Sequence, residues 1–311
     1  KFVNKADIKN DSIYIRVDKR LNDSNEIIIL LDNYKKEKRV RRSEGNLSSG
    51  YLSQKSNVNT KKDLYSISWN FLSMDEDSFL EKVNAKAYYQ NQHISDLWLE
   101  EKKIEDITSD YNHYDKSYGF DFQFGSSFKN HFLTYGIDYS LTENKYHQDK
   151  IYKIVGFIMP TYRGDIYPIK RSPDSETQRL GVYLQDEIKY KNFEIIGGLR
   201  FDNYKINPSQ DSIYQRYCSS DPNENTCPPS EPLDESKPTP KIAITYPINK
   251  ELEIWGQYSK GFRAPTWWEK EATHINSVSD YQVLPNDELK SESSNNFEIG
   301  LRGDYKKYKF E

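Results

Sequence analysis

Short segments in which apolar and polar side chains alternate recur along the whole chain, and the connections between them are by turns very short and long. The short connections carry Asn, Asp or Lys, which is typical of tight β-hairpins. The predicted strand pairs are residues 12–21 and 25–38, 62–73 and 80–92, 115–126 and 131–144, 177–190 and 193–206, and 239–248 and 251–262, with 292–304 leading into a strand cut off at Glu311.

Long polar segments separate these hairpins, at about residues 39–61, 93–114, 145–176, 207–238 and 263–291. In outer-membrane barrels the short turns face the periplasm and the long loops face outward. A soluble β-sandwich would rarely place all its long loops at one end. The alternation of short and long connections therefore predicts an all-β fold, namely an antiparallel transmembrane β-barrel with short periplasmic turns and long extracellular loops.

The two faces of each predicted strand differ in chemistry. Within 180–190, for example, Leu180, Val182 and Leu184 share one face. Gln185, Glu187 and Lys189 share the other, because side chains alternate with a period of two. Charged inner faces suit a wet lumen or a plug surface, although a soluble sheet with one solvated face alternates in the same way. The strand lengths favour the membrane, since a tilted spanning strand needs about 9–11 residues.

Eleven complete strands and the start of a twelfth make up one predicted domain over residues 1–311. Transporters with barrels of about 22 strands carry a plug. The charged inner face and the open last strand therefore suggest part of such a larger barrel, and no plug is recognisable in this chain.

Composition supports a barrel and excludes several other classes. Only 35% of the 311 residues are apolar and 30% are charged, yet 14% are aromatic, whereas disordered chains are poor in aromatic residues. No apolar run of about 18 residues predicts a membrane helix. The net charge of −4 gives no excess of basic residues of the kind that binds nucleic acid. The first residues, Lys1 to Lys5, contain no apolar segment of a signal peptide.

Two cysteines, Cys218 and Cys227, lie in the long polar segment 207–238. No neighbouring Cys or His completes a tetrahedral metal site, so a disulfide is the favoured interpretation over a metal pair. A disulfide would imply an oxidising compartment.

Several strand motifs resemble consecutive strands of TonB-dependent outer-membrane receptors. They are Gly181–Glu187, Gly198–Tyr204, Tyr258–Pro265, Pro285–Glu292 and Asn295–Arg302, and they occur in the order and phase of that family over about residues 177–304. The resemblance implies a Gram-negative outer-membrane location and uptake powered by a TonB–ExbB–ExbD complex acting on a plug.

Within that family the chain is most similar to the haemoglobin and haem receptor branch, where two sequence boxes flank a loop histidine that contacts haem. The first box, Phe262-Arg263-Ala264-Pro265, is intact here. The second reads Pro285-Asn286-Asp287-Glu288-Leu289 and departs from the Asn-Pro-Asn-Leu-like pattern. The resemblance implies transport of haem taken from a host haemoprotein such as haemoglobin. The alternatives are a receptor for a ferric siderophore or for transferrin iron, and a non-transporting adhesin barrel.

His274 lies between the two boxes and is the first candidate for contact with haem iron, because neutral imidazole is a good iron ligand. Tyr281 is a second candidate in the same segment. Trp267 and Trp268 follow the first box and suit either an outer aromatic girdle or contact with a porphyrin or protein partner. Arg263 and Pro265 are expected to fix the exit from strand to loop.

The remaining histidines are weaker candidates. His131 is expected beside a periplasmic turn, and His93, His113 and His147 are expected in or near outer loops. A basic run at the first long segment could bind lipopolysaccharide phosphates or steer an acidic partner: Lys35, Lys36, Lys38, Arg39, Arg41 and Arg42. No hydrolase, zinc-protease or phosphate-loop motif is present, so an enzyme is not expected.

Overall fold

The computed structural model describes residues 4–42, 47, 50–75, 78–103, 105–154, 157–159, 161–162, 165–166, 168–214, 230–276, 281–305 and 308–310. Its long strands are β1 (Lys5–Asn22), β2 (Asn25–Arg41), β3 (Tyr51–Leu72), β4 (Leu80–Lys102), β5 (Glu105–Phe128), β6 (His131–Ile154), β10 (Asp174–Tyr190), β11 (Phe193–Ser209), β12 (Leu233–Pro247), β13 (Leu252–Arg263) and β16 (Glu292–Tyr305). The short elements are β7 (Phe157–Met159), β8 (Thr161–Tyr162), β9 (Asp165–Ile166), helix α1 (Trp267–Glu271), β14 (His274–Asn276), β15 (Tyr281–Val283) and β17 (Tyr308–Phe310).

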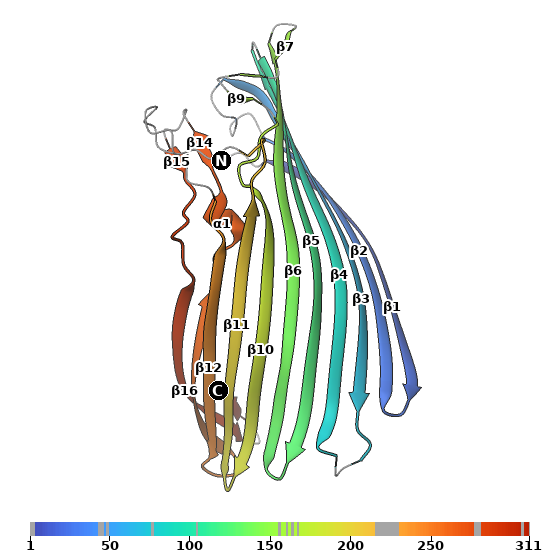
Figure 1. The fold of residues 1–311 in the computed structure, drawn as a ribbon, viewed down its shortest axis with the longest axis vertical. Helices are drawn as coiled ribbons and strands as arrows, with labels where there is room; N and C mark the ends of the chain where they lie inside the picture. The colour runs from blue at the N-terminus through green and yellow to red at the C-terminus, as the bar shows by residue number, and fades with distance from the viewer. Residues whose placement is uncertain are drawn as a thin grey trace.

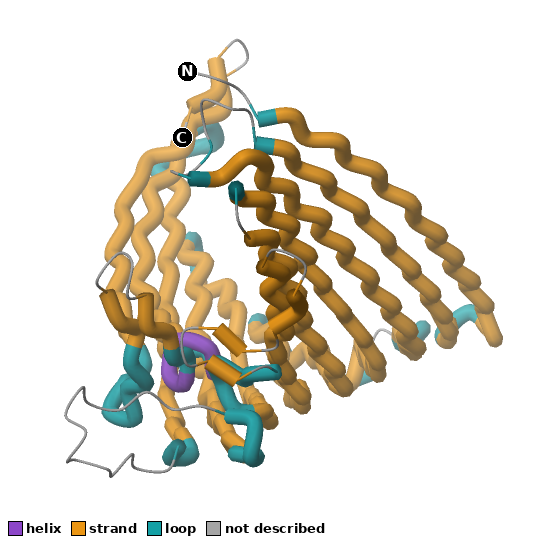
Figure 2. The backbone as a smooth tube through the Cα atoms, turned by 90° about the horizontal axis from the view of Figure 1, so that it is seen from above, coloured by secondary structure: helices purple, strands orange, loops and turns teal. Residues whose placement is uncertain are grey.

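The long strands form one antiparallel sheet in which each strand pairs with its neighbours in sequence (Figure 1). Over the described residues the order runs from β1 to β17, and β1 and β17 are the two edges. The sheet is therefore a curved wall that does not close on itself (Figure 2). The predicted all-β antiparallel fold is confirmed, and the described residues form eleven long strands followed by the short β17.

The pairing registers place apolar side chains of neighbouring strands on the same face of the wall. Leu184 of β10 lies opposite Tyr135 of β6 and Leu199 of β11. The side chains on this outer face are solvent-exposed, 52% for Leu184 and 54% for Leu199. A continuous face of large apolar side chains normally contacts a protein partner or lipid, and a lipid bilayer would cover this face.

The inner face of the wall carries charge. Arg200 of β11 donates to both carboxylate oxygens of Asp138 on β6, at 2.7 and 2.9 Å, and its Nε donates to Asp202 at 2.8 Å. To reach β6 the guanidinium must pass over β10, and it does so at Gly181, where an added Cβ would collide with it. Glycine at this position therefore permits an ion pair that spans three strands.

The strands extend further at the long-loop end than the sequence predicted. Residues 93–102 and 105–114, expected as a loop, belong to β4 and β5. Polar residues can continue a ladder above the membrane because strand pairing satisfies their backbone groups as water does. The prediction of a loop there was wrong, since a polar composition marks contact with water and not the absence of strand structure.

Other long connections are partly ordered into elements. Strand β6 runs to Ile154, β3 begins at Tyr51, and the segment 263–291 contains α1, β14 and β15. No described helix is long and apolar enough to cross a membrane. Cys218 and Cys227 lie outside the described residues, so their disulfide stays a prediction.

A charge on the outer face should cost far more than the same charge on the inner face. Leu184→Arg is expected to destabilise the protein in lipid vesicles by about 2–4 kcal/mol, because the guanidinium would sit near mid-bilayer. The matched control, Gln185→Arg, changes the adjacent residue, which faces inward. Equilibrium unfolding from vesicles measures both, and equal losses would contradict the assignment of faces.

Candidate functional site

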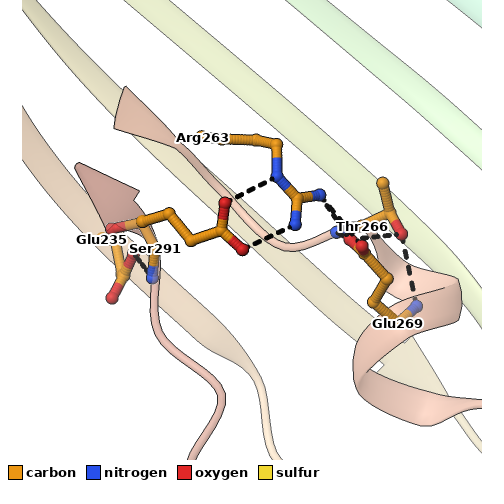
Figure 3. Close-up of polar contacts among 6 residues, drawn as sticks. Glu235, Arg263, Thr266, Glu269 and Ser291 are labelled. Atoms are coloured by element: carbon orange, nitrogen blue, oxygen red, sulfur yellow. Dashed lines mark hydrogen bonds and ion pairs between the residues drawn. The ribbon is translucent and has the colours of Figure 1, made fainter. Parts of the chain in front are cut away.

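The first sequence box ends β13 and is tied to the start of β16 by Arg263. Its Nη2 donates to Glu292 Oε1 at 2.9 Å, and its Nη1 donates to both carboxylate oxygens of Glu269 at 2.9 Å (Figure 3). One guanidinium thus joins two neighbouring strands to α1. The predicted role of Arg263, fixing the exit from the strand, agrees with these contacts.

Helix α1 begins at a complete capping box formed by Thr266 and Glu269. The Glu269 amide donates to Thr266 Oγ1 at 3.2 Å, and the Thr266 amide donates to Glu269 Oε2 at 2.9 Å. Reciprocal bonds of this kind satisfy backbone donors that a helix start leaves unpaired. The Thr-x-x-Glu spacing is a recognisable helix signal in the sequence, and it was missed there because the segment was assigned as a loop.

The pKa values of the two carboxylates around Arg263 lie below the ordinary value. The Thr266 amide and the Arg263 guanidinium lower the pKa of Glu269. Arg263 likewise lowers the pKa of Glu292. Each carboxylate therefore stabilises the fold fully above its ordinary pKa of 4.5, and that contribution disappears as the pH falls through the lowered value.

A buried lysine links α1 to the second sequence box. Lys270 and Glu271 are fully buried, and Lys270 Nζ donates to Glu271 Oε1 at 2.7 Å and to Asp287 Oδ1 at 2.9 Å. It also donates to the Glu231 carbonyl. The Asn286 amide donates to the Lys270 carbonyl at 2.9 Å. The second box thus docks on the helix that follows the first, a link that the sequence pattern did not reveal.

The two boxes together line one small cavity of about 270 Å³ between Arg263, Pro265, Glu269, Leu289, Lys290 and Glu292. Ligand pockets usually measure about 300–1,000 Å³. The space is smaller than most ligand pockets, and the six side chains connect the two boxes around it. We call these six residues the clasp, and the long-loop end of the wall the rim. The boxes therefore position the segment between them.

Both tryptophans of α1 lie on the inner side of the wall. Trp267 and Ala264 pack on the buried cluster of Tyr204, Ile206 and Leu233. The Trp268 ring lies 5.6 Å from His113 of β5 and 5.0 Å from Tyr146 of β6, centroid to centroid. The expectation of an outer aromatic girdle for these residues was wrong, because the helix turns them toward the inner face.

His274 and Tyr281 are brought together by the β14–β15 hairpin. Their ring centroids lie 5.6 Å apart, edge to face. Arg171 also contacts His274, its Nη1 donating to the imidazole Nδ1, while its Nε donates to Gln148 Oε1 at 2.8 Å. A guanidinium can only donate, so Nδ1 accepts and the neutral ring carries its proton on Nε2. In this arrangement Arg171 occupies Nδ1 and the proton occupies Nε2, so iron coordination by the ring would require Arg171 to move.

Two threonine contacts hold Arg171 in place. The Thr273 amide donates to the Arg171 carbonyl at 2.7 Å, and the Thr273 hydroxyl donates to it at 3.0 Å. Sequence reasoning did not find Arg171, because it is distant in sequence from both boxes.

The other histidines occupy strands. His93, His113 and His147 lie on β4, β5 and β6 and not in loops, because polar residues at this end continue the strand ladder. Of these, His113 contacts the site through Trp268, and burial lowers its pKa. His131 begins β6 beside the tight turn, as predicted, and its Nδ1 lies 2.7 Å from Asp186 Oδ2. No group of three or more metal-ligating side chains occurs among the described residues.

The Arg263 clasp should loosen in acid. We expect the hydrogen-exchange protection of the Ala272 amide, which donates to the Trp268 carbonyl, to be constant from pH 7 to 5 and to fall below about pH 4.5, after correction for intrinsic rates. Arg263→Gln should weaken protection at neutral pH and flatten this response. Arg16→Gln, which removes an exposed pair on β1, is the control. Unchanged protection in Arg263→Gln would contradict the role of the clasp.

Removing the buried cation should release the second box. Lys270→Met leaves the Glu271 and Asp287 carboxylates without their partner, and breaking such a pair costs about 3–5 kcal/mol. The loss should appear as a lower opening free energy of α1 in hydrogen exchange. The double variant Lys270→Met/Glu271→Gln should recover part of it, because one buried charge is then also removed. No recovery would mean that lost packing, not charge, explains the effect.

Comparison with known proteins agrees with this architecture. The chain matches the family described as "TonB dependent receptor-like, beta-barrel" over residues 9–310. No curated protein gives a significant match.

Several solved structures share the fold. The ferric yersiniabactin uptake receptor FyuA from Yersinia pestis has a TM-score of 0.59 at 13% identity, covering 97% of this chain and 43% of that one. FpvA from P. aeruginosa, bound to heterologous pyoverdines, has a TM-score of 0.61 at 14% identity, covering 96% and 40%. The Serratia marcescens hemophore receptor HasR, in complex with its hemophore HasA and heme, has a TM-score of 0.57 at 14% identity, covering 96% and 50%.

At such identities the likeness concerns the fold alone. The chain spans only two fifths to one half of these structures. The family match covers nearly all of it, in agreement with the antiparallel wall, the two faces and the long-loop end described above. The chain belongs to the β-barrel family of TonB-dependent receptors.

Proposed function

We propose that this chain forms part of the barrel of an outer-membrane transporter that takes up an iron chelate, with haem from a host haemoprotein as the cargo. The observation that carries the proposal is the folded rim on the inner side of the wall. There the two boxes clasp a segment that presents His274 and Tyr281 with their rings 5.6 Å apart. Imidazole and phenolate are both known haem-iron ligands.

The rim also offers surface for a flat ligand. Trp268 packs on His113 and on the buried Tyr146, and it is 36% exposed on the inner face. Aromatic faces bind planar ligands through large contact areas. Under this proposal a haem would rest against the Trp268 ring while its iron meets the β14–β15 hairpin.

Energy for transport would come from a TonB–ExbB–ExbD complex acting on a plug domain inside the complete barrel. The charged inner face, with the Arg200, Asp138 and Asp202 group, suits contact with water or with such a plug. The Gram-negative outer membrane is the location that goes with this function, since the apolar outer face requires lipid. The described wall would be one part of a single barrel domain.

A ferric siderophore is the second candidate cargo, and one contact favours it. Arg171 donates to His274 Nδ1, so the two together present a cationic and an aromatic group. Such a pair suits an anionic chelate whose iron is already fully coordinated. FyuA and FpvA, which share the fold, are described as a ferric yersiniabactin receptor and as a complex with ferric pyoverdines.

Two variants of the complete receptor separate these cargoes. If haem is the cargo, His274→Ala should weaken haemin binding at least tenfold and shift the Soret band, because an axial ligand is lost, while Arg171→Gln should leave binding intact or tighten it. If a siderophore is the cargo, Arg171→Gln should be the damaging change. His131→Ala, at the opposite end of the wall, is the control. A Soret spectrum unaffected by His274→Ala would remove that residue from the haem site.

Uptake itself distinguishes a transporter from an adhesin. Cells that carry the complete receptor should accumulate labelled cargo only when TonB is present, because transport needs the energy that TonB delivers. Binding without TonB-dependent accumulation would support a non-transporting barrel.

A further inference from the structure

A lysine on the inner face of the wall has no carboxylate beside it. Lys241 of β12 lies opposite Gly198 of β11 and opposite Ser259 of β13. Gly198 is two residues from the inward-facing Arg200, so the period of two puts the lysine and both of its partners on the inner face. Leu199, next to Gly198 in β11, belongs to the exposed apolar outer face. Lys241 therefore lies in the spanning part of the wall.

The pairing registers define eight nearest neighbours of Lys241 on the inner face. None of the eight is acidic: Gly198, Ser259, Thr239, Ala243, Ile196, Arg200, Gln257 and Gly261. The one cation among them, Arg200, already donates to Asp138 and Asp202. Among the described residues Lys241 is in no ion pair. Its ammonium group is therefore available to an anion.

The carboxylates just beyond these neighbours accept hydrogen bonds from other side chains. Gln185 lies across Gly198 on β10, and its Nε2 donates to Glu187 Oε1 at 2.8 Å. On β13, Gln257 Nε2 donates to Glu298 Oε2 at 2.9 Å. Neither carboxylate lies directly opposite Lys241, so neither neutralises it as Asp138 and Asp202 neutralise Arg200.

Gly198 lets the lysine side chain lie flat on the wall. A Cβ added to Gly198 would lie 2.9 Å from Lys241 Cε and 3.1 Å from its Cγ, so the stem crosses the bare backbone of β11. Beside it is a cavity of about 340 Å³. Its inner-face lining consists of Tyr183, Gln185, Gly198, Arg200, Thr239, Lys241 and Ser259. Ligand pockets measure about 300–1,000 Å³, so this space is large enough for part of a small molecule.

The lining of this cavity supplies hydrogen-bond donors and contains no acidic residue. Ser259 and Thr239 place hydroxyl groups on either side of Lys241, one on the neighbouring strand and one on the same strand. The Thr239 hydroxyl donates to the Arg200 carbonyl at 3.3 Å, which is a long bond. An ammonium group flanked by hydroxyl groups binds a carboxylate through charge-assisted hydrogen bonds.

The cavity lies below the rim on strands that also carry the clasp. Four residues of β13 separate Ser259 from Arg263, which corresponds to about 13 Å along the strand. The inner-face position between them is Gly261, and Ser294 of β16 lies opposite it. Small uncharged residues therefore cover the wall between the clasp and Lys241, and they leave room for a ligand to pass.

We propose that Lys241, with Ser259, Thr239 and the cavity beside them, binds a carboxylate of the cargo below the rim, as a second and transient site on the inner face. Haem carries two propionate carboxylates, which suit this chemistry. The inference rests on the proposed uptake of haem and adds a site in the lumen to the one at the rim. The path of small residues from the clasp favours the cargo over a carboxylate of a plug domain.

The test measures uptake and binding separately in the complete receptor. Cells with Lys241→Gln should accumulate haemin through TonB about fivefold more slowly than wild type, or more slowly still, because a charge-assisted bond is lost. Haemin affinity from a Soret titration of the purified receptor should be unchanged, because the rim is intact. Lys241→Arg should retain uptake. The matched control, Lys86→Gln, removes an exposed inner-face lysine that lies opposite Asp121 and should leave uptake unchanged.

Haemin dimethyl ester, in which both carboxylates are blocked, identifies the group that Lys241 binds. Uptake of the ester should not change in Lys241→Gln. Equal slowing of haemin and its ester would assign the lysine to contact with a plug or to barrel stability, and would overturn the proposal. Unchanged haemin uptake in Lys241→Gln, or an equal loss in Lys86→Gln, would also overturn it. Absence of TonB-dependent haemin uptake in wild type is a different result, because it contradicts the proposed function itself.

Discussion

The backbone hydrogen-bond ladder is the interaction on which the rest of this structure depends. A bilayer offers no water to peptide groups, so every spanning residue must pair its N–H and C=O with a neighbouring strand. That requirement explains why consecutive strands lie side by side and why their registers run for as many as 24 residues in β5 and β6. It also explains the two faces, because a fixed register sends alternate side chains to lipid and to the lumen.

The rim is built differently, from specific side-chain bonds. Above the membrane the ladder is no longer obligatory, and a five-residue helix has too few internal bonds to persist alone. Arg263, the Thr266–Glu269 capping box and the buried Lys270 hold it instead. These contacts join β13, β16, α1 and the second box. The segment carrying His274 and Tyr281 is thereby positioned by groups that are not themselves available to a ligand.

The two faces of the wall serve two environments at nearly the same height. Inside, Trp268, His113 and Tyr146 gather beside Arg171 and His274. Outside, Tyr114 stacks between His93 and His147, above the neighbouring rings of Tyr65, Tyr89 and Tyr118. On β5, His113 and Tyr114 are adjacent in sequence and point in opposite directions.

The sequence by itself determined the fold class, the strand pairs within hairpins, the tight turns and the two faces of the segments in which apolar and polar residues alternate. Those features depend on a period of two and on turn residues, both of which are local in the chain. It did not determine where strands end above the membrane, because polar residues suit a ladder and a loop equally well. Only the tertiary structure decided the contacts of Lys270 with Asp287 and of Arg171 with His274, and the inward orientation of Trp267 and Trp268. Those groups lie far apart in sequence, and cross-strand register and the docking of α1 bring them together.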